Sequence, residues 1–589
     1  MTGERPASLR TDLPDLLKGV PLLSGLPDEL RNAVAERATM ITLPAGEWLF
    51  RQDDVGDAMF LVLSGRVEVV LEHPVNEVVR VLGRGGVVGE LALLTEAPRS
   101  AGVRARRDTE LLALDRVRFV ELLTEEARFA MALTREIGMQ LRTSRALEPP
   151  KSDRPATIAL VPLIGEARFN ELREALYAAL ERCGPIAELT PSEDVESHGP
   201  MLDRAERDSE RVLLPTRGPS AADEWTAFSL RQSDRTVVVA EETTTDVAVP
   251  DALRAADLLL LVSADRPPES VPLLDTLDPR TVHVVRSGVR FRDDVARAAR
   301  RLSGRSVGLV LSGGGARGFC HIGVIQELLD AGLEIDRVGG CSMGAYIAGM
   351  CAIGMDPAAM RNRCHEEFVL RSVTSDYTVP LVALLRGRRA LEMLVNTFGD
   401  ARIEAQPRDY FCVSADLISG QLIEHRRGPF TEAVGASMCL PGVFRPWPAP
   451  GRLLVDGGVL NNLPVQQMAR SGEGPVFAVD VTAQFTAPER GAGRFRRART
   501  RAWATRARSF VIGANEPLPN LIETLARSVS VGSTATDDAA RHRADALIAP
   551  DTGGVAMLDF GRLDEMIAIG RRAAADTLAA ETLPGHQQG

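Results

Sequence analysis

The sequence predicts a multidomain protein, with an N-terminal β-roll plus helices, a middle α/β domain and a C-terminal α/β domain. The chain has 589 residues and a hydrophobic fraction of 45%, enough for several separate cores. Short strands with regular turn residues fill the first part, whereas apolar strands alternate with helical periodicity in the rest. We place the domains at 1–150, 151–304 and 305–589.

The first domain has the pattern of a β-roll framed by helices. The expected elements are a helix over 26–38, strands over 47–50, 58–63 and 66–70, and one or two helices over 117–141. The proline-containing stretch 147–153 is typical of a linker.

The middle domain has the pattern of a parallel sheet. Its expected elements are strands over 157–163, 235–240 and 257–262 and a helix over 166–183. Strands this uniformly apolar are buried on both faces, as in parallel sheets covered by helices. The segment contains no phosphate loop, metal cluster or nucleophile elbow that we recognise, so its role is not predicted.

The third domain opens with a glycine loop, Gly313-Gly314-Gly315-Ala316-Arg317-Gly318. A strand over 306–311 precedes it and a helix over 319–330 follows. Backbone N–H groups in such a loop can converge on the oxyanion of a tetrahedral intermediate, and Arg317 adds a cation. A phosphate-binding turn is the alternative, but the spacing G-x-G-x-x-G and a Gly-Lys-Ser/Thr sequence are both missing.

Two further motifs complete a candidate hydrolase site. Gly340-Cys341-Ser342-Met343-Gly344 fits a strand-to-helix turn that exposes a serine nucleophile. Asp456 follows a strand over 453–455, precedes two glycines, and could take the serine proton directly. Each motif alone also fits a plain glycine turn. His321, His365 and His425 stand in no catalytic context, which favours a Ser-Asp dyad.

Taken in this order, the three motifs resemble the patatin-like phospholipase family. The resemblance covers roughly 305–550 and includes Asn461-Asn462-Leu463-Pro464 after the aspartate. It implies an α/β sheet and hydrolysis of acyl esters of lipids. It also implies these roles: Ser342 as nucleophile, Asp456 as base, and Gly313, Gly314, Gly315 and Arg317 as the oxyanion site.

A second pair of segments lies in the first domain. Val88-Gly89-Glu90-Leu91 and Arg99-Ser100 resemble the phosphate-binding cassette of cyclic nucleotide-binding domains. A buried Arg99 can pair with the cyclic phosphate, and Glu90 can accept from the ribose 2′-hydroxyl. Gly89, the backbone near Leu91, and Ser100 complete the site. The regulatory ligand is cAMP or cGMP, or the roll is a scaffold that has lost its ligand.

The domain order as a whole resembles neuropathy-target-esterase-like lysophospholipases. The net charge of −11 argues against nucleic acid as a partner. Seven cysteines without a CxxC pair are typical of reduced thiols in a cytoplasmic protein. We recognise no signal peptide and no apolar window long enough to span a bilayer. We expect no metal and no catalytic cofactor.

One basic segment could place the protein peripherally at a membrane. Residues 490–510 contain eight arginines and no acidic residue, with Phe495, Trp503 and Phe510 between them. On a helix this segment would suit an anionic lipid surface; the alternative is an exposed loop.

The sequence therefore predicts a serine esterase of phospholipids or lysophospholipids that uses a Ser-Asp dyad and is regulated by a cyclic nucleotide. Two alternatives remain. The first is a non-catalytic cyclic nucleotide sensor, which would be expected to have lost Ser342, Asp456 or a loop glycine. The second is a lipid acyltransferase with the same dyad, which product analysis alone separates from a hydrolase.

Overall fold

The computed structural model describes two structural units. It covers residues 27–135, 157–482 and 532–580 together with Leu17 and Leu23, apart from gaps at 74–76, 96, 192–197, 246–249, 251–252, 255, 263–270, 379–381, 534 and 554. The first unit contains the chain up to Arg305 and also Ala469–Gly474, and the second contains the rest. The predicted linker at 147–153 and the basic segment 490–510 lie outside the described residues. The division into three domains stays a prediction.

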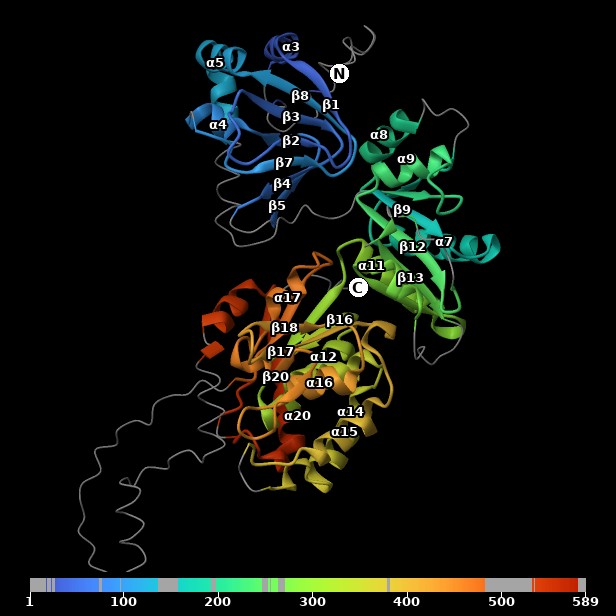
Figure 1. Ribbon diagram of the computed structural model, residues 1–589, viewed down its shortest axis with the longest axis vertical. Coiled ribbons are helices and arrows are strands. Elements are labelled where there is room, and N and C mark those ends of the chain that lie inside the picture. Colours follow the sequence, from blue (N-terminus) through green and yellow to red (C-terminus); the bar gives the residue numbers. More distant parts are fainter. Residues whose placement is uncertain are drawn as a thin grey trace, which may run out of the picture. The chain divides into compact units, whose positions relative to one another are not determined.

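The N-terminal part of the first unit is a β-roll, drawn in blue in Figure 1. Two four-stranded antiparallel sheets have the strand orders β1-β8-β3-β6 and β2-β7-β4-β5. The strands are β1 (Thr39–Leu43), β2 (Trp48–Phe50), β3 (Ala58–Ser64), β4 (Val67–Leu71), β5 (Glu77–Leu82), β6 (Val87–Val88), β7 (Gly102–Ala105) and β8 (Thr109–Asp115), with helices α3 (Asp28–Arg37), α4 (Glu90–Thr95) and α5 (Arg116–Glu125). The predicted β-roll with flanking helices is confirmed.

The middle part of the chain forms a six-stranded sheet with the order β10-β11-β9-β12-β13-β14. All its pairings are parallel, as predicted. The elements are β9 (Thr157–Pro162), β10 (Ile186–Glu188), β11 (Arg211–Pro215), β12 (Arg235–Glu241), β13 (Asp257–Val262), β14 (Val282–Arg286), α7 (Glu166–Glu181), α8 (His198–Asp208), α9 (Glu224–Gln232), α10 (Leu273–Leu277) and α11 (Phe291–Leu302). On β13, Leu259 packs with α7 and α11, while Leu258 packs on the opposite face with α10. Burial of both faces explains the uniformly apolar strand sequences.

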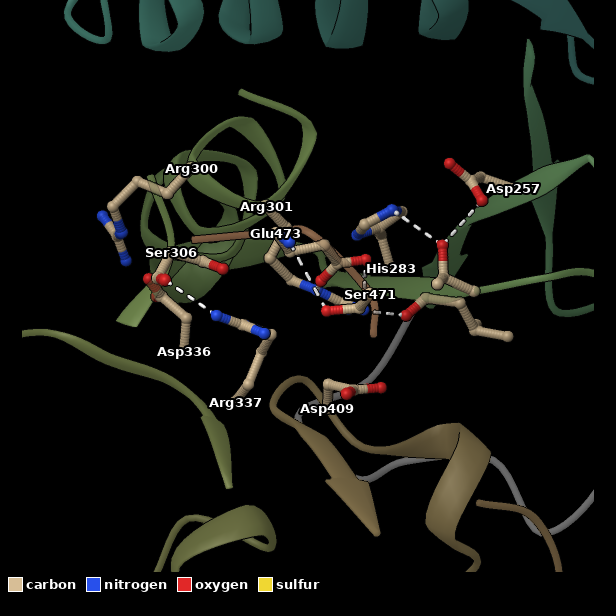
Figure 2. Close-up of polar contacts among 12 residues, drawn as sticks. Asp257, His283, Arg300, Arg301, Ser306, Asp336, Arg337, Asp409, Ser471 and Glu473 are labelled. Carbon is tan, nitrogen blue, oxygen red and sulfur yellow. Dashed lines mark hydrogen bonds and ion pairs between the residues drawn. The ribbon is translucent and has the colours of Figure 1, made fainter. Parts of the chain in front are cut away.

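A short segment from much later in the sequence completes this first unit. Residues 469–474 belong to it, and they place the buried carboxylate of Glu473 beside Arg301 (Figure 2). Glu473 accepts hydrogen bonds from Arg301 Nε at 2.7 Å and from Arg235 Nη2 at 3.2 Å. Asp257 contacts the other side of Arg235 at 2.5 Å. Two buried cations thus face two buried carboxylates, an arrangement that the sequence did not reveal.

The second unit is an α/β domain around one mixed sheet. Its order is β19-β20-β17-β16-β15-β21-β22, with β18 paired to β17. The strands are β15 (Val307–Leu311), β16 (Ile335–Gly340), β17 (Asp409–Asp416), β18 (Leu422–His425), β19 (Trp447–Ala449), β20 (Arg452–Asp456), β21 (Val476–Val479) and β22 (Ala546–Ile548). The helices are α12 (Cys320–Asp330), α13 (Met343–Ala352), α14 (Pro357–Cys364), α15 (Arg388–Phe398), α16 (Phe430–Ser437), α17 (Val465–Ala469) and α20 (Leu563–Ala580). Strands β15, β16, β17, β21 and β22 run parallel, and β18, β19 and β20 run antiparallel to their neighbours.

The register of this sheet brings the separated motifs into one row. Gly340 on β16 lies opposite Cys412 on β17, and Ser414 on β17 lies opposite Asp456 on β20. Ser342 lies two residues after Gly340, and Ser414 lies two residues after Cys412. The strand pairing therefore aligns Ser342 with Asp456 across β17, although 114 positions separate them in the sequence.

Candidate active site

Ser342 occupies a strained turn between β16 and α13. Its backbone has φ 53° and ψ −122°, a left-handed conformation that residues with a side chain rarely adopt. Such conformations cost about 1–3 kcal/mol and persist where surrounding structure enforces them. The Ser342 N–H donates to Ser437 Oγ at 3.0 Å, which helps to fix the turn. The strain presents the hydroxyl at the start of α13.

The two glycines of the elbow are required by close packing against β15. A Cβ at Gly340 would lie 2.5 Å from the carbonyl oxygen of Leu311, and one at Gly344 would lie 2.2 Å from it. Both distances are far inside van der Waals contact. The G-x-S-x-G pattern thus records how tightly the elbow rests on the neighbouring strand.

Asp456 lies at the end of β20 and is only 3% exposed. Burial raises the pKa of its carboxyl group, and hydrogen bonds from the Ser342 side chain, the Gly458 N–H and the Cys341 thiol oppose that rise. The Gly458 N–H donates at 2.8 Å and Cys341 Sγ at 3.4 Å. No positively charged group is among the causes of its pKa shift. The carboxylate is therefore an unusually basic aspartate beside the serine.

The glycine loop runs from β15 into a short 3₁₀ helix, Gly315–Phe319. Gly315 has φ 58°, and a Cβ there would lie 2.2 Å from the carbonyl oxygen of Met557. The Gly313 N–H already donates to the Asn462 carbonyl at 3.3 Å. Within the described residues, no hydrogen bond uses the N–H of Gly314 or Gly315. Those two donors are the ones available to an oxyanion.

Arg317 and His321 hold the glycine loop in position. Arg317 is 6% exposed, and its Nε donates to the Val555 carbonyl at 2.8 Å. His321 is fully buried, and its Nε2 lies 2.9 Å from the Ser312 carbonyl. Burial lowers the pKa of His321 to about 4, so the ring is neutral and donates this bond at pH 7. The histidine fixes the start of the loop.

Asn462 connects the glycine loop to the segment after Asp456. Its Nδ2 donates to the Gly313 carbonyl at 3.3 Å and to Thr482 Oγ1 at 3.2 Å. A Cβ on Gly313 would come within 2.5 Å of Asn462 Oδ1, so glycine is required there. The Asn462 backbone N–H is held by Asp537 at 3.1 Å. Sequence resemblance pointed to Asn461 and Asn462 without a role, and gave no sign of Ser437 or Asp537.

A cavity of about 1610 Å³ opens onto these groups. Its lining includes Ser342, Asp456, Arg317 and the three loop glycines, together with apolar side chains such as Met393, Leu394 and Phe560. His425 also lines it and hydrogen-bonds to Ser414 Oγ at 2.8 Å. The sequence gave no functional context to His425. A cavity of this size with an apolar wall can hold an acyl chain beside the serine.

The predicted nucleotide-binding residues come together at the end of β6. Arg99 is 2% exposed and donates to the Gly89 carbonyl at 2.9 Å and the Ala58 carbonyl at 2.8 Å. Gly89 has φ 83°, and a Cβ there would lie 2.4 Å from an Arg99 guanidinium nitrogen. Glu90 is buried at the start of α4, whereas Leu91 and Ser100 are exposed. Burial lowers the pKa of Arg99, although Asp57 opposes this.

The described residues contain no candidate metal site and no candidate membrane-spanning helix. No group of three or more His, Cys, Asp or Glu side chains there could hold a metal ion. Within the same residues, every helix is too short or too polar to cross a bilayer.

Two family models match the chain. Residues 309–469 match the patatin-like phospholipase model, and residues 40–126 match the cyclic nucleotide-binding domain model. The protein therefore joins an N-terminal cyclic nucleotide-binding β-roll to a patatin-like α/β domain, as the sequence predicted.

Whole-chain relatives define the family more narrowly. NTE family proteins of Mycobacterium tuberculosis and Mycobacterium bovis are 34% identical to it over 589 residues, with 98% of each chain covered. The neuropathy target esterase sws of Drosophila melanogaster is 28% identical over 515 residues, which cover 75% of this chain and 36% of the fly protein. A solved structure of the Thermus thermophilus catabolite activator protein covers 27% of this chain and 70% of its own at 29% identity, with a TM-score of 0.21. The chain belongs to the NTE family.

Proposed function

We propose that this protein is a serine esterase that hydrolyses acyl ester bonds of phospholipids or lysophospholipids. Membership of the NTE family and the patatin-like domain support lipid esterase activity. The observation that carries the finer proposal is the alignment of Ser342, in its strained elbow, with the buried Asp456 at the wall of an apolar cavity.

In the proposed mechanism, Asp456 acts as base and acid in turn. Ser342 Oγ attacks the ester carbonyl while its proton passes to Asp456. The oxyanion accepts hydrogen bonds from the N–H groups of Gly314 and Gly315, each such donor being worth about 3–4 kcal/mol of barrier. Asp456 then protonates the leaving alcohol. Water attacks the acyl-serine while passing a proton to Asp456, and Asp456 returns that proton to Ser342 Oγ as the fatty acid leaves.

In this proposal Gly313 and Arg317 support the oxyanion site indirectly. The Gly313 N–H and the Arg317 Nε already donate to backbone carbonyls, so these two groups do not donate to the oxyanion. Gly313 permits the close approach of Asn462 that fixes the loop. Arg317 lines the cavity while its Nε is held by the Val555 carbonyl, so its positive charge stays near the developing negative charge.

The test compares Ser342→Ala and Asp456→Asn with the wild type on a lysophospholipid. We expect each substitution to lower kcat by about 10⁴- to 10⁶-fold, because the two groups act as one unit. Ser419→Ala, at an exposed serine outside the cavity lining, is the matched control and should keep wild-type turnover. Thermal unfolding checks that each variant is folded. Wild-type turnover in folded Ser342→Ala would refute the mechanism, and fatty acid transferred to an added alcohol instead of water would identify an acyltransferase.

We further propose that the β-roll binds cAMP or cGMP as a regulatory ligand at Gly89, Glu90, Leu91, Arg99 and Ser100. The match to the cyclic nucleotide-binding domain model and the buried Arg99 support this proposal. Binding must change hydrolysis if the ligand is regulatory. Because coupling between two sites is reciprocal, a substrate analogue at Ser342 must then change nucleotide affinity by the same factor. Titration of nucleotide with and without the analogue measures this factor, and a factor of one would exclude regulation of substrate binding.

A further inference from the structure

The cavity in front of Ser342 has an excess of positive charge. Seven arginines line it, against three acidic residues: Glu424, Glu432 and the proposed base Asp456. Its histidine, His425, is neutral at pH 7 because its pKa is lowered to about 4. A neutral ester of a fatty acid needs no such charge, so the arginines call for an explanation beyond acyl-chain binding.

Some of these arginines are neutralised by the chain itself. Arg426 pairs with Asp409 at 3.2 Å and also with Glu424. Arg388 contacts Glu392 at 3.6 Å. These side chains hold the cavity wall together.

Three others are not neutralised. Within the described part of the chain, no carboxylate lies within ion-pair distance of Arg386, Arg445 or Arg452. Arg445 reaches only the backbone carbonyl of Arg386, at 3.5 Å, which makes these two residues neighbours. All three are exposed at the cavity wall, so their positive charges are open to an anionic ligand.

Strand β20 relates one of these arginines to the catalytic base. Arg452, Leu454 and Asp456 all line the cavity, whereas Leu453 and Val455 do not. This alternation is the two-residue period of a strand, with one face turned to the cavity. At about 3.3 Å per residue, the backbones of Arg452 and Asp456 are about 13 Å apart. An arginine side chain and a glycerol unit can together bridge that distance.

Strand β19 places a second cation nearer the base. Its pairing sets Trp447 opposite Leu454 and Ala449 opposite Arg452. Arg445 comes two residues before Trp447, hence toward the Asp456 end of the strand pair. The free guanidinium groups therefore line the wall at two depths along one strand pair.

The positive charge of Arg452 acts on His425 inside the cavity. After burial, its positive charge is the second cause that lowers the pKa of His425. The same field disfavours any cationic group of a ligand and favours an anionic one.

We propose that the cavity selects lipid acyl esters with an anionic phosphate head group, whose oxygens bind Arg386, Arg445 and Arg452. This proposal rests on the esterase function proposed above. Guanidinium groups bind phosphate oxygens in pairs of parallel hydrogen bonds. A zwitterionic head group would bring its ammonium near the same positive charges. Among the described residues that line the cavity, Glu432 is the one exposed acid outside an ion pair. The acyl chain lies against the apolar wall formed by Met393, Leu394 and Phe560.

The test uses three short monoacyl lipids with the same acyl chain, below their micelle concentration. One carries phosphoglycerol, one phosphocholine, and one is a monoacylglycerol without phosphate. We expect the wild type to prefer the phosphoglycerol ester by kcat/KM. In the triple variant Arg386→Gln, Arg445→Gln, Arg452→Gln, the ratio of kcat/KM for the phosphoglycerol ester to that for monoacylglycerol should fall about 10- to 100-fold, mainly through KM. The single variants guard against misfolding of the triple variant.

Arg572→Gln is the matched control. Arg572 is exposed on α20 and is absent from the cavity lining, so its loss should leave the ratio unchanged. Inorganic phosphate and glycerol 3-phosphate serve as competitors. Inhibition by glycerol 3-phosphate but not by inorganic phosphate assigns the site to a lipid head group, whereas equal inhibition by inorganic phosphate would show a plain anion site and overturn the proposed selectivity.

The outcomes separate this proposal from the function on which it rests. If Ser342→Ala is inactive but the wild type hydrolyses all three lipids equally, the head-group proposal is wrong and the esterase stands. If the wild type hydrolyses none of them, calorimetry with the phosphoglycerol lipid still tests the arginines. Binding that is lost in the triple variant then supports the anionic site without the reaction, and binding that persists overturns it.

Discussion

Two buried arginines in the first unit, Arg301 and Arg99, face very different surroundings. The Arg301 side chain is 2% exposed and lies 2.7 Å from Glu473, whose side chain is 1% exposed. The Arg99 side chain is also 2% exposed, but its carboxylate neighbour Asp57 is 83% exposed. The Arg99 guanidinium also donates to the backbone carbonyls of Gly89 and Ala58. Where both charges are buried, the chain supplies its own counter-charge in a closed ion pair. Where only the cation is buried, an external anion can bind to it.

The same reasoning extends to the second unit. Arg426 at the cavity wall is paired with Asp409, as Arg301 is with Glu473. Arg452 has no such partner among the described residues. It resembles Arg99 in this respect, although it lies at the surface. Asp456 has the opposite charge: it is a buried carboxylate that accepts hydrogen bonds from the neutral groups of Ser342, Gly458 and Cys341. A charged group with no opposite charge buried against it in an ion pair therefore marks each of the three proposed sites.

The largest effect is expected from breaking the closed pair. Glu473→Gln removes the carboxylate that contacts both buried arginines, whereas Arg235 keeps its contact with Asp257. Loss of one partner from a buried ion pair typically costs about 3–5 kcal/mol. Hydrogen exchange at the amides of β13 and β14 should show this loss as faster opening, together with a lower unfolding temperature. Glu565→Gln removes an exposed pair with Arg562 and is the matched control, with an expected effect below about 1 kcal/mol.

A second pair of variants separates the loss of a counter-charge from the loss of packing. Replacing Arg235 and Arg301 by Met in the Glu473→Gln background removes the two buried cations that contacted Glu473. Apolar replacements of buried ion pairs are often neutral or stabilising, so stability should return. If Glu473→Gln alone behaves like the control, the closed-pair interpretation is wrong.

Substitution of Arg99 should affect ligand binding more than protein stability, whereas Glu473→Gln should affect mainly stability. Arg99→Gln should weaken cyclic nucleotide binding by about 10- to 100-fold, since a charge-assisted bond to phosphate is lost. Its effect on stability should be smaller than that of Glu473→Gln, because the carboxylate in contact with Arg99, Asp57, is exposed. Calorimetric titration with cAMP and cGMP measures the affinity. Arg118→Gln on α5 keeps the roll site intact and should bind as the wild type does. Equal affinity in Arg99→Gln would remove Arg99 from the ligand site.

How much of this was visible in the sequence depends on the range of the interactions. The roll, the parallel sheet and the three hydrolase motifs follow from local patterns, because strand periodicity and each glycine motif are recognisable within a few consecutive residues. The partners of those motifs are not local. Ser437 is 95 residues from Ser342, and Asn462 is 149 residues from Gly313. Their ordinary side chains carry no signature until the sheet register brings them together.

The closed pair shows the same limit. Glu473 lies in a short, plain segment between α17 and β21, and nothing in its composition assigns residues 469–474 to the first unit. The unpaired arginines of the cavity were also hidden, because a count of arginines does not tell which of them have partners. Pairing is a property of the fold, so it could be read only from the structure.

The smallest effect expected concerns two aspartates at strand ends, Asp456 and Asp416. Burial raises the pKa of Asp456, so its ionised form costs stability once the pH exceeds the ordinary aspartate value of about 3.9. Hydrogen bonds from Ser419 and nearby backbone lower the pKa of Asp416 to about 2, so its ionised form adds stability that is lost as the pH falls from about 3.9 to about 2. Asp456→Asn should therefore raise the unfolding temperature at pH 7, and Asp416→Asn should lower it.

The pH dependence distinguishes these opposite signs from packing effects. The gain from Asp456→Asn should shrink as the pH falls toward about 3.9, where the wild-type carboxyl becomes protonated in both the folded and the unfolded state. The loss from Asp416→Asn should shrink only at still lower pH. Calorimetric unfolding between pH 7 and the acid limit of reversible folding measures both. A gain in unfolding temperature in Asp456→Asn that is constant with pH would show that the buried carboxylate is not its cause. The proposed catalytic base would then lack the raised pKa.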